Sequence, residues 1–283
     1  MPPPELPHPL TGRRFPSPVA PGTGWPGDPA DAATPVARSA SDAASLAAAS
    51  QALADVDACS SVCRACPRLV AWREDVAVTR RRAYAGEPYW GRPITGWGDE
   101  RAHLLIVGLA PAAHGGNRTG RIFTGDRSGD WLFAALHRAG LADLPTSTAA
   151  GDGQRLRGVR ITAAVRCAPP GNRPEPGERD ACASWLDREV TLLEPGLRAV
   201  LALGGFAWEA TLGCIRRLGW TADPPRPRFA HGGTAQLATG AGRQLALVGS
   251  YHVSQQNTFT GRLTESMLDA ALAEAAGLPP NAP

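Results

Sequence analysis

The side chains best suited to chemistry gather in one glycine-rich segment, residues 108–126. It reads Gly-Leu-Ala-Pro-Ala-Ala-His-Gly-Gly-Asn-Arg-Thr-Gly-Arg-Ile-Phe-Thr-Gly-Asp. The imidazole of His114 and the carboxylate of Asp126 can accept or donate a proton, and the amide of Asn117 can both donate and accept hydrogen bonds. The ring of Phe123 can stack on a planar ligand. We therefore expect this segment to bind a ligand.

The residues just before this segment indicate where it should lie. Residues 104–107 (Leu-Leu-Ile-Val) form a short apolar run, which is typical of a strand buried on both faces of a parallel sheet. Open α/β sheets bind their ligands in the loop that leaves the carboxyl end of such a strand. Beyond the loop, Ser128 is expected to cap a helix that contains residues 131–136.

The cysteines form a second set of reactive side chains. The expected metal ligands are Cys63, Cys66, Cys167 and Cys182. The first two make a tight C-x-x-C pair and the other two are a loose pair, and four thiolates suffice for either a [4Fe-4S] cluster or a structural zinc ion. Zinc ribbons usually combine two tight pairs, so the loose pair favours iron-sulfur. Cys59 remains an alternative to Cys63, and Cys214 is expected to be a small buried hydrophobe.

Strands and helices are expected to alternate along the chain. Apolar runs predict strands at residues 104–107, 159–165, 199–203 and 245–248. Helical spacing of apolar residues predicts helices at residues 41–58, 178–193, 206–212 and 264–275. Residues 80–99 are expected to be an irregular connection. This alternation favours a parallel sheet with helices on both faces.

Three of these strands run into loops that carry polar residues. In a parallel sheet the carboxyl ends of all strands open on the same edge. That geometry would bring Phe123, Asp126, Asn172 and His252 into one cleft from distant parts of the sequence. A nucleotide-binding sheet would give a similar layout, so the layout alone does not identify the ligand.

The basic residues are unusual in kind. The net charge is only +3, but all 29 basic residues are arginine. Arginine binds phosphate in a forked geometry and stacks on bases. A GC-rich genome also produces an excess of arginine, alanine, glycine and proline, so composition alone does not indicate a nucleic-acid partner. The absence of lysine excludes a Schiff base on a side-chain amine.

The chain is expected to divide into a tail and one domain. Residues 1–45 are rich in proline, alanine and serine without an apolar period, and they predict a disordered tail. Residues 46–283 are then a single domain. The sequence shows neither a secretion signal nor a run of apolar residues long enough to span a membrane. We therefore expect a cytoplasmic protein, in which cysteines are metal ligands or buried thiols rather than disulfides.

Four motifs together carry a resemblance to a known family. The motifs are Gly-Leu-Ala-Pro-Ala-Ala-His-Gly-Gly-Asn-Arg-Thr-Gly-Arg at 108–121 with Phe-Thr-Gly-Asp at 123–126, Cys-Pro-Arg-Leu at 66–69, Arg-Cys-Ala-Pro-Pro-Gly-Asn at 166–172 and His-Val-Ser-Gln-Gln-Asn at 252–257. In their order along the chain, these motifs resemble those of the family 5 uracil-DNA glycosylases, which are iron-sulfur members of the uracil-DNA glycosylase superfamily. The resemblance covers about residues 59–261, which is most of the folded part.

The resemblance implies a fold, a cofactor and an activity. The implied fold is a three-layer α/β/α sandwich around a four-stranded parallel sheet. The implied cofactor is a [4Fe-4S] cluster with a structural role. The implied activity is the removal of uracil, and of some other deaminated bases, from single- or double-stranded DNA in base excision repair. We expect a monomer that does not act on membranes.

The resemblance, read with the chemistry of the residues, assigns roles in the cleft. A base inside a duplex must be flipped out before it can be recognised and released. Phe123 would stack on the flipped base, and Asn172 would bond the N3–H and O4 of uracil, which cytosine does not match. His252 would donate a hydrogen bond to O2 as negative charge gathers there. Asp126 would orient the attacking water and stabilise the oxocarbenium ion.

Purely structural roles are an alternative for the same residues. Asp126 is also placed to be the carboxylate at the start of a helix, and Asn172 to be an ordinary turn residue. The family lacks the polar residue that other uracil glycosylases carry directly after the first strand, and residues 110–113 here show the same absence. Asp126 is therefore the preferred catalytic residue, with His114 and Asn117 as its rivals.

The remaining polar residues of these loops suit DNA. The expected base contacts are Gly108, Ala110, His114, Phe123 and Asn172. The expected DNA contacts are Asn117, Arg118, Arg121, Ser254, Gln255 and Asn257, with Arg166 and Arg173 at the same edge. Val253 or Phe259 is expected to wedge into the gap left by the flipped base. The small side chains at 110–113 indicate a wide pocket that accepts more than uracil.

Two other classes of protein stay open at this point. Four cysteines are also compatible with an iron-sulfur redox protein, although no flavin motif or second cluster motif accompanies them. The missing polar residue after the first strand is compatible with a relative that binds lesions without cutting. If the protein is an enzyme, the lack of lysine predicts a monofunctional glycosylase that leaves the abasic site intact.

Overall fold

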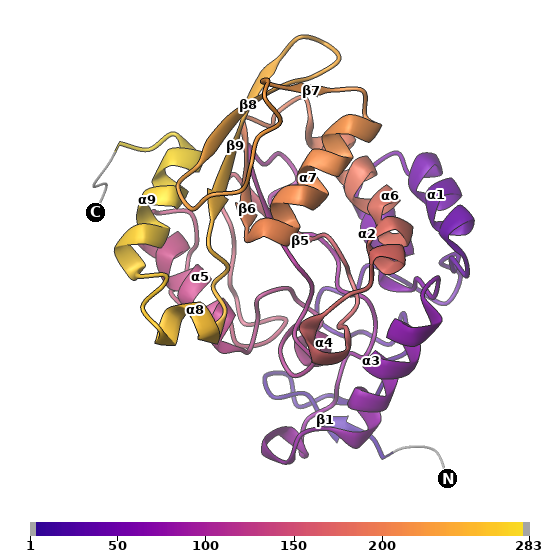
Figure 1. Ribbon diagram of the computed structural model, residues 1–283. Helices are drawn as coiled ribbons and strands as arrows, with labels where there is room; N and C mark the ends of the chain where they lie inside the picture. The colour runs from indigo at the N-terminus through magenta and orange to yellow at the C-terminus, as the bar shows by residue number, and fades with distance from the viewer. Residues whose placement is uncertain (1–3, 280–283) are drawn as a thin grey trace.

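A seven-stranded mixed sheet forms the centre of the protein in the computed structural model, which describes residues 4–279 (Figure 1). In spatial order the strands are β3 (Trp97–Gly98), β5 (Val159–Ala163), β4 (Leu104–Gly108), β6 (Ala199–Leu203), β9 (Gln244–Ser250), β8 (Thr234–Ala238) and β7 (Thr221–Ala222). The four middle strands, β5, β4, β6 and β9, pair in parallel. Strands β3, β8 and β7 extend the sheet in antiparallel orientation.

The predicted four-stranded parallel sheet is thus right only in part. Its strands are those of the parallel centre, but the sheet has seven strands and is mixed. Two of the missed strands, β3 and β7, are only two residues long. The third, β8, alternates exposed and buried residues, so it has no continuous apolar run that would mark a strand buried on both faces.

Helices cover both faces of the sheet. Helices α5 and α9 pack on one face, and α6 and α7 pack on the other (Figure 1). The bounds are α1 (Ala40–Ala49), α2 (Leu53–Ser61), α3 (Pro67–Thr79), η1 (Arg82–Tyr84), α4 (Gly116–Thr119), α5 (Arg127–Arg138), η2 (Pro170–Asn172), α6 (Pro176–Leu193), α7 (Gly205–Arg217), α8 (Gln255–Phe259) and α9 (Glu265–Ala276). No helix within residues 4–279 is both long and apolar enough to cross a bilayer.

The helix expected at residues 41–58 is broken in two. Helix α1 ends at Ala49, and α2 starts three residues after the C-cap Ser50. The carboxylate of Asp55 accepts hydrogen bonds from the backbone N–H groups of Gln51 and Ala52, at 2.8 and 2.9 Å. These bonds satisfy the first free N–H groups of a new helix, which is why the chain restarts there.

The expectation of a disordered tail is wrong for residues 4–45. Two short strands, β1 (Leu6–Pro7) and β2 (Arg14–Phe15), pair in this segment. Phe15 and Trp25 are almost fully buried and pack with Trp90 of the following domain. Because these aromatic residues are far apart and follow no period, the sequence pattern could not show that they share one cluster. Residues 1–3 lie outside the described part.

A buried ion network joins the sheet to the helices of one face. The carboxylate of Glu189 on α6 is completely buried and accepts hydrogen bonds at 2.5 Å from Arg160 of β5 and from Arg166. Arg160 also donates to Asp57 of α2, at 2.7 and 2.8 Å. Burial raises the pKa of Asp57 to about 6, an effect that the nearby Arg160 opposes. The network therefore links β5, α2, α6 and the loop after β5.

Removing the central charge of this network should strongly destabilise the fold. We expect Glu189→Gln to lower the free energy of unfolding by about 3–5 kcal/mol, because two buried guanidinium groups lose their shared carboxylate. Urea denaturation followed by circular dichroism measures this loss. In the control Asp143→Asn, the carboxyl pairs with the 70% exposed Arg157 side chain, so we expect a loss below about 1 kcal/mol. Equal losses in the two variants would contradict the prediction.

Candidate active site

The aromatic part of the site is built where β4 ends. Phe123 has a left-handed backbone (φ 48°) and its ring lies over Gly108, the last residue of β4. A Cβ atom at Gly108 would lie 2.9 Å from that ring, so a side chain at this position would displace it. The rings of Phe123 and His252 are 6.2 Å apart and tilted by 39°. The structure therefore brings Gly108, Phe123 and His252 together, as the sequence predicted.

His252 sits just beyond the carboxyl end of β9. Asn257 donates a hydrogen bond from Nδ2 to the backbone oxygen of His252, at 2.8 Å, and so ties α8 to this position. A Cβ atom at Gly204 would lie 3.3 Å from the Cβ of His252. Burial lowers the pKa of His252 to about 4. The imidazole is therefore neutral near pH 7 and can donate one hydrogen bond without carrying a charge.

Asp126 is at once a helix cap and a buried carboxylate. It is the N-cap of α5, and its Oδ1 accepts a hydrogen bond from Gly129 N at 2.9 Å. The prediction that Ser128 caps this helix is therefore wrong, because the cap is Asp126. Its Oδ2 lies against Gly115, where an added Cβ would be 1.9 Å away. Burial raises the pKa of Asp126, while the Gly129 hydrogen bond partly offsets this.

Asn172 lies in an exposed turn after β5. It is exposed in the short turn η2, with a left-handed backbone (φ 56°), which is the geometry of the turn-residue alternative. Within the described residues, no hydrogen bond or ring contact joins it to Phe123, His252 or Asp126. Its position in the cleft stays a prediction.

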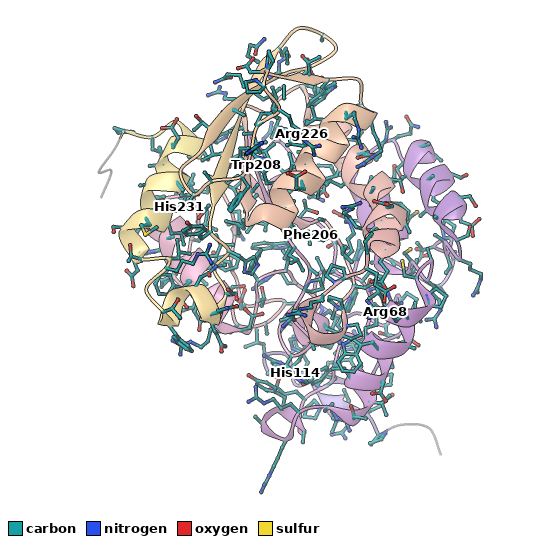
Figure 2. All side chains as sticks on the ribbon, in the orientation of Figure 1. Arg68, His114, Phe206, Trp208, Arg226 and His231 are labelled. Atoms are coloured by element: carbon teal, nitrogen blue, oxygen red, sulfur yellow. The ribbon has the colours of Figure 1, made fainter. Side chains whose placement is uncertain are left out.

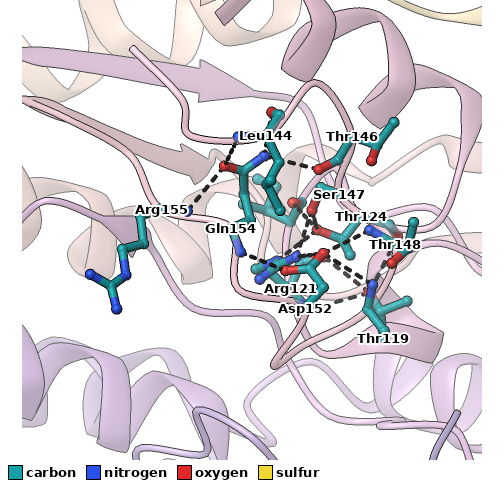
Figure 3. A network of polar contacts seen from close by, with 12 residues as sticks. Thr119, Arg121, Thr124, Leu144, Thr146, Ser147, Thr148, Asp152, Gln154 and Arg155 are labelled. Atoms are coloured by element: carbon teal, nitrogen blue, oxygen red, sulfur yellow. Dashed lines mark hydrogen bonds and ion pairs between the residues drawn. The ribbon is translucent and has the colours of Figure 1, made fainter. Parts of the chain in front are cut away.

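The arginines of the loop hold the loop itself and are not free for DNA. Arg121 is 6% exposed and bonds Thr124, Ser147 and Asp152 in a network that Figure 3 shows. Arg118 is equally buried, donates to the oxygen of Gly125 at 2.9 Å and pairs with a glutamate. The predicted DNA contacts of Arg118 and Arg121 are therefore wrong, because both guanidinium groups are used inside the protein.

A further prediction for this loop, that for Asn117, is corrected in the same way, whereas the role of His114 stays a prediction. Asn117 is fully buried, and its Nδ2 donates to the backbone oxygen of Arg73 at 3.1 Å, so it can neither touch DNA nor rival Asp126. His114 bonds the hydroxyl of Tyr89 at 3.0 Å through Nδ1. Figure 2 shows His114 well separated from His231, whose ring stacks on the residue next to His252. Within the described residues, no hydrogen bond or ring contact joins His114 to Phe123 or His252.

Arg166 is corrected as well, whereas Arg173 remains at the surface. The side chain of Arg166 is 1% exposed and belongs to the buried network around Glu189. Arg173 directly follows η2 and is exposed. Of these two predicted DNA contacts, only Arg173 can meet a ligand from solution.

The exposed face of α8 carries the groups that can meet a large ligand. Gln255 and Phe259 are exposed, Phe259 by 65%, and Ser254 precedes them as the N-cap. Val253 is completely buried, so of the two predicted wedges only Phe259 is available. The guanidinium of Arg127 lies over the Phe259 ring, 4.9 Å from its centre.

Sequence reasoning missed several residues of this region. Arg127 and Arg262 are exposed, and Arg262 stacks on Tyr251, the neighbour of His252. Gly115 and Gly204 leave room for Asp126 and His252. The Gly-Gly pair after the third predicted strand was a signal that could have pointed to Gly204. The two arginines carried no local signal that separated them from the other arginines of the chain.

Four thiols line one cavity. The lining includes Cys63, Cys66, Cys167 and Cys182 together with Leu69 and Trp185. Arg73 donates a hydrogen bond from Nη1 to the Cys167 sulfur at 3.0 Å. Burial raises the pKa of Cys66 to about 12 and also raises the pKa of Cys182. In residues 4–279, no three His, Cys, Asp or Glu side chains are arranged to hold a single metal ion.

The two other cysteines do not line this cavity. Cys59 is buried in α2 within a small apolar cluster, and Cys214 is buried on α7. This placement favours Cys63 over Cys59 as a ligand and agrees with Cys214 as a buried hydrophobe.

Comparison with known proteins gives consistent matches. The sequence model of the uracil DNA glycosylase superfamily matches residues 95–276. The type-5 uracil-DNA glycosylase of Mycobacterium tuberculosis is 58% identical over 95% of this chain and 97% of its own length. That of Thermus thermophilus is 54% identical over 76% of this chain and 93% of its own length. A type-4 uracil-DNA glycosylase of Pyrobaculum aerophilum is 32% identical over 46% of this chain and 58% of its own length.

The depressed pKa of His252 should be measurable. Its imidazole should titrate near pH 4 in nuclear magnetic resonance spectra of the folded protein. In the unfolded chain it binds a proton below about pH 6.5. Between these values the unfolded state binds more protons, so the free energy of unfolding falls as the pH falls, by about 3 kcal/mol for this residue.

The variant His252→Gln isolates this contribution from the carboxyl groups that titrate in the same range. We expect the difference in unfolding free energy between wild type and variant to shrink as the pH falls from 6.5 to 4. A difference that is constant across this range would contradict the assignment.

Proposed function

The chain belongs to the uracil DNA glycosylase superfamily and is a uracil-DNA glycosylase of DNA repair, and we propose that Asp126 and His252 are its catalytic residues. One observation carries the assignment of the site. A neutral imidazole lies beside an aromatic ring at the carboxyl edge of the parallel strands, and the buried carboxylate of Asp126 begins the helix that follows the same loop. This is the edge at which such sheets bind ligands.

His252 would act on the departing base. When the bond between N1 of uracil and C1′ of the sugar breaks, its electron pair stays on the base and negative charge spreads to O2. A neutral imidazole donates a hydrogen bond to that oxygen. Because burial keeps the pKa of His252 near 4, the donor stays a neutral imidazole that does not protonate the base. A fixed donor in a buried site is worth a few kcal/mol in the transition state.

Asp126 would act on the sugar side. The sugar gains positive charge as the bond breaks, and a buried carboxylate stabilises that charge more than an exposed one does. A carboxylate oxygen of Asp126 can also accept a hydrogen bond from the water that attacks C1′. The water oxygen forms the new bond, and its proton balances the charge on the released uracil anion. The raised pKa of Asp126 means that this role needs a higher pH than an ordinary aspartate would.

Base recognition would use Phe123 as the stacking face above Gly108 and Ala110. Asn172 is proposed to bond the N3–H and O4 of uracil from the exposed turn η2. Small residues after β4 leave space beside the ring. This space supports acceptance of other deaminated bases besides uracil.

The DNA would lie across α8. Gln255, Ser254 and the exposed Phe259 are placed for phosphate contacts and for a wedge into the base stack. Arg127 and Arg262 supply exposed positive charge at the same place. With no lysine in the chain, no side-chain amine can form the Schiff base needed for strand cleavage, so we infer a monofunctional enzyme. We further propose that it is monomeric and cytoplasmic and acts on single- or double-stranded DNA in base excision repair.

The four thiols fit a [4Fe-4S] cluster better than a zinc ion. Zinc needs all its sulfur ligands within about 2.3 Å of one point, and residues 4–279 include no group of three His, Cys, Asp or Glu side chains that could hold a metal ion in this way. In a four-iron cluster each thiolate binds a different iron, so the sulfurs surround a larger volume. Cys63, Cys66, Cys167 and Cys182 would hold it and join α3 to α6. When bound it would supply structural cross-linking.

The variant Asp126→Asn tests the catalytic assignment. We expect the single-turnover rate of uracil release from a duplex to fall by about 10² to 10⁴, since the water loses its acceptor and the sugar loses a nearby charge. Alkali-labile breaks on a gel measure the abasic product. Asp130→Asn is the matched control, because Asp130 is an exposed acid on the same helix turn, and its rate should stay near that of wild type. A wild type that binds uracil-containing DNA without releasing uracil would indicate a lesion-binding protein.

Cysteine variants test the cluster. We expect Cys66→Ala to lose most of its bound iron and acid-labile sulfide, because Cys66 lines the cavity. Cys214→Ala should keep wild-type iron and sulfide, since its thiol is buried elsewhere. Zinc in place of iron, measured by elemental analysis of protein purified without air, would refute the proposal.

A further inference from the structure

Arg73 is a buried cation that faces the cysteine cavity. Its side chain is 1% exposed. It lies on α3, seven residues after Cys66. Its Nη1 donates hydrogen bonds to the Cys167 sulfur at 3.0 Å and to the Cys63 backbone oxygen at 3.1 Å. Its Nε has no hydrogen-bond partner among the described residues.

The other buried arginines each have a close carboxylate. Within residues 4–279 the pairs are Arg92 with Asp28, Arg118 with Glu87, Arg121 with Asp152, Arg160 with Glu189 and Arg166 with Glu189, all at 2.5 or 2.6 Å. Arg73 differs, because its nearest carboxylate oxygen belongs to Glu74 and is 3.7 Å away. Glu74 is itself bound to the exposed Arg64.

A buried guanidinium without a counter-charge costs several kcal/mol. The groups that can become anionic beside Arg73 are the thiols of the cavity, with Cys167 in direct contact. Four thiolates around a [4Fe-4S] core carry net negative charge. The missing partner of Arg73 is therefore what this cavity would hold.

We propose that Arg73 is the counter-charge of the cluster and sets its reduction potential and its resistance to oxidation. This rests on the proposed [4Fe-4S] cofactor. A cation that hydrogen-bonds a ligand sulfur stabilises the more negatively charged states of a cluster, so it raises the potential and makes oxidative loss harder. Arg73 is a positioning residue, since it touches neither the DNA nor the reacting atoms.

The same residue connects the cluster to the catalytic loop. The backbone oxygen of Arg73 accepts a hydrogen bond from Asn117 Nδ2 on α4, at 3.1 Å. The next residue, Arg118, donates to the oxygen of Gly125, which directly precedes Asp126. Three hydrogen bonds thus link the proposed cluster ligand Cys167 to the residue that precedes the proposed catalytic carboxylate. This linkage also accounts for the complete burial of Asn117.

The variants Arg73→Gln, Arg73→Lys and Arg64→Gln test the proposal on the full chain purified without air. Arg64→Gln is the matched control, because it removes one exposed positive charge from the same cysteine segment. Iron and sulfide content, the midpoint potential from a redox titration followed by electron paramagnetic resonance, and the rate of bleaching by ferricyanide are the readouts. We expect Arg73→Gln to have a lower potential and to bleach several-fold faster than wild type and Arg64→Gln.

Each outcome separates the inference from the proposal beneath it. A wild type without iron and sulfide overturns both. A wild type with a cluster whose potential and bleaching rate match those of Arg73→Gln overturns the inference alone. If Arg73→Gln does not fold, Arg73→Lys decides, because the shorter lysine side chain cannot place its ammonium group where Nη1 of Arg73 contacts both the Cys167 sulfur and the Cys63 oxygen. A potential and bleaching rate of Arg73→Lys equal to wild type would then overturn it.

Discussion

The shared carboxylate of Glu189 is the constraint on which the rest of the structure depends. Two guanidinium groups meet on it inside the protein, one from β5 and one from the loop after β5. Buried charges of this kind tolerate little displacement, since each lost partner leaves an uncompensated ion. The loop that begins with Arg166 is therefore held in place, and it carries Cys167 into the cavity that the thiols before α3 and the thiol of α6 also line.

Charge inside the protein and charge on its surface have different tasks. The arginines of the motif loop, Arg118 and Arg121, bond backbone and side chains of that loop, so they fix the position of Asp126. Positive charge available to DNA comes from Arg127 and Arg262, which lie over exposed or half-buried aromatic rings. A protein with a net charge of only +3 can in this way present positive charge along the proposed DNA path.

Burial shifts the pKa values of the two proposed catalytic groups in opposite directions. It lowers the pKa of His252 to about 4 and raises the pKa of Asp126. Each group moves toward its neutral form, because a low-dielectric site disfavours charge. Neutral His252 is the required donor throughout the neutral range, whereas Asp126 must pay the desolvation cost to be anionic. Gly115 and Gly204 make the burial possible by leaving no side chain in the way.

The sequence by itself determined the parallel centre of the sheet, the cysteine set and the meeting of Phe123 with His252. Apolar runs and cysteine spacing are local properties, and the edge rule for parallel strands needs only the strand order. Edge strands such as β8 escaped notice because half of their residues face solvent. The packing of residues 4–45 escaped notice because its aromatic residues follow no period.

Only the tertiary structure decided which polar side chains are free. Arg121 and Asn117 look like DNA contacts in the sequence, yet Asp152 and the backbone of Arg73 occupy them. The partner that buries a charge lies tens of residues away, and no local pattern records it. Burial of an arginine is a property of the pair, and the fold alone brings the pair together.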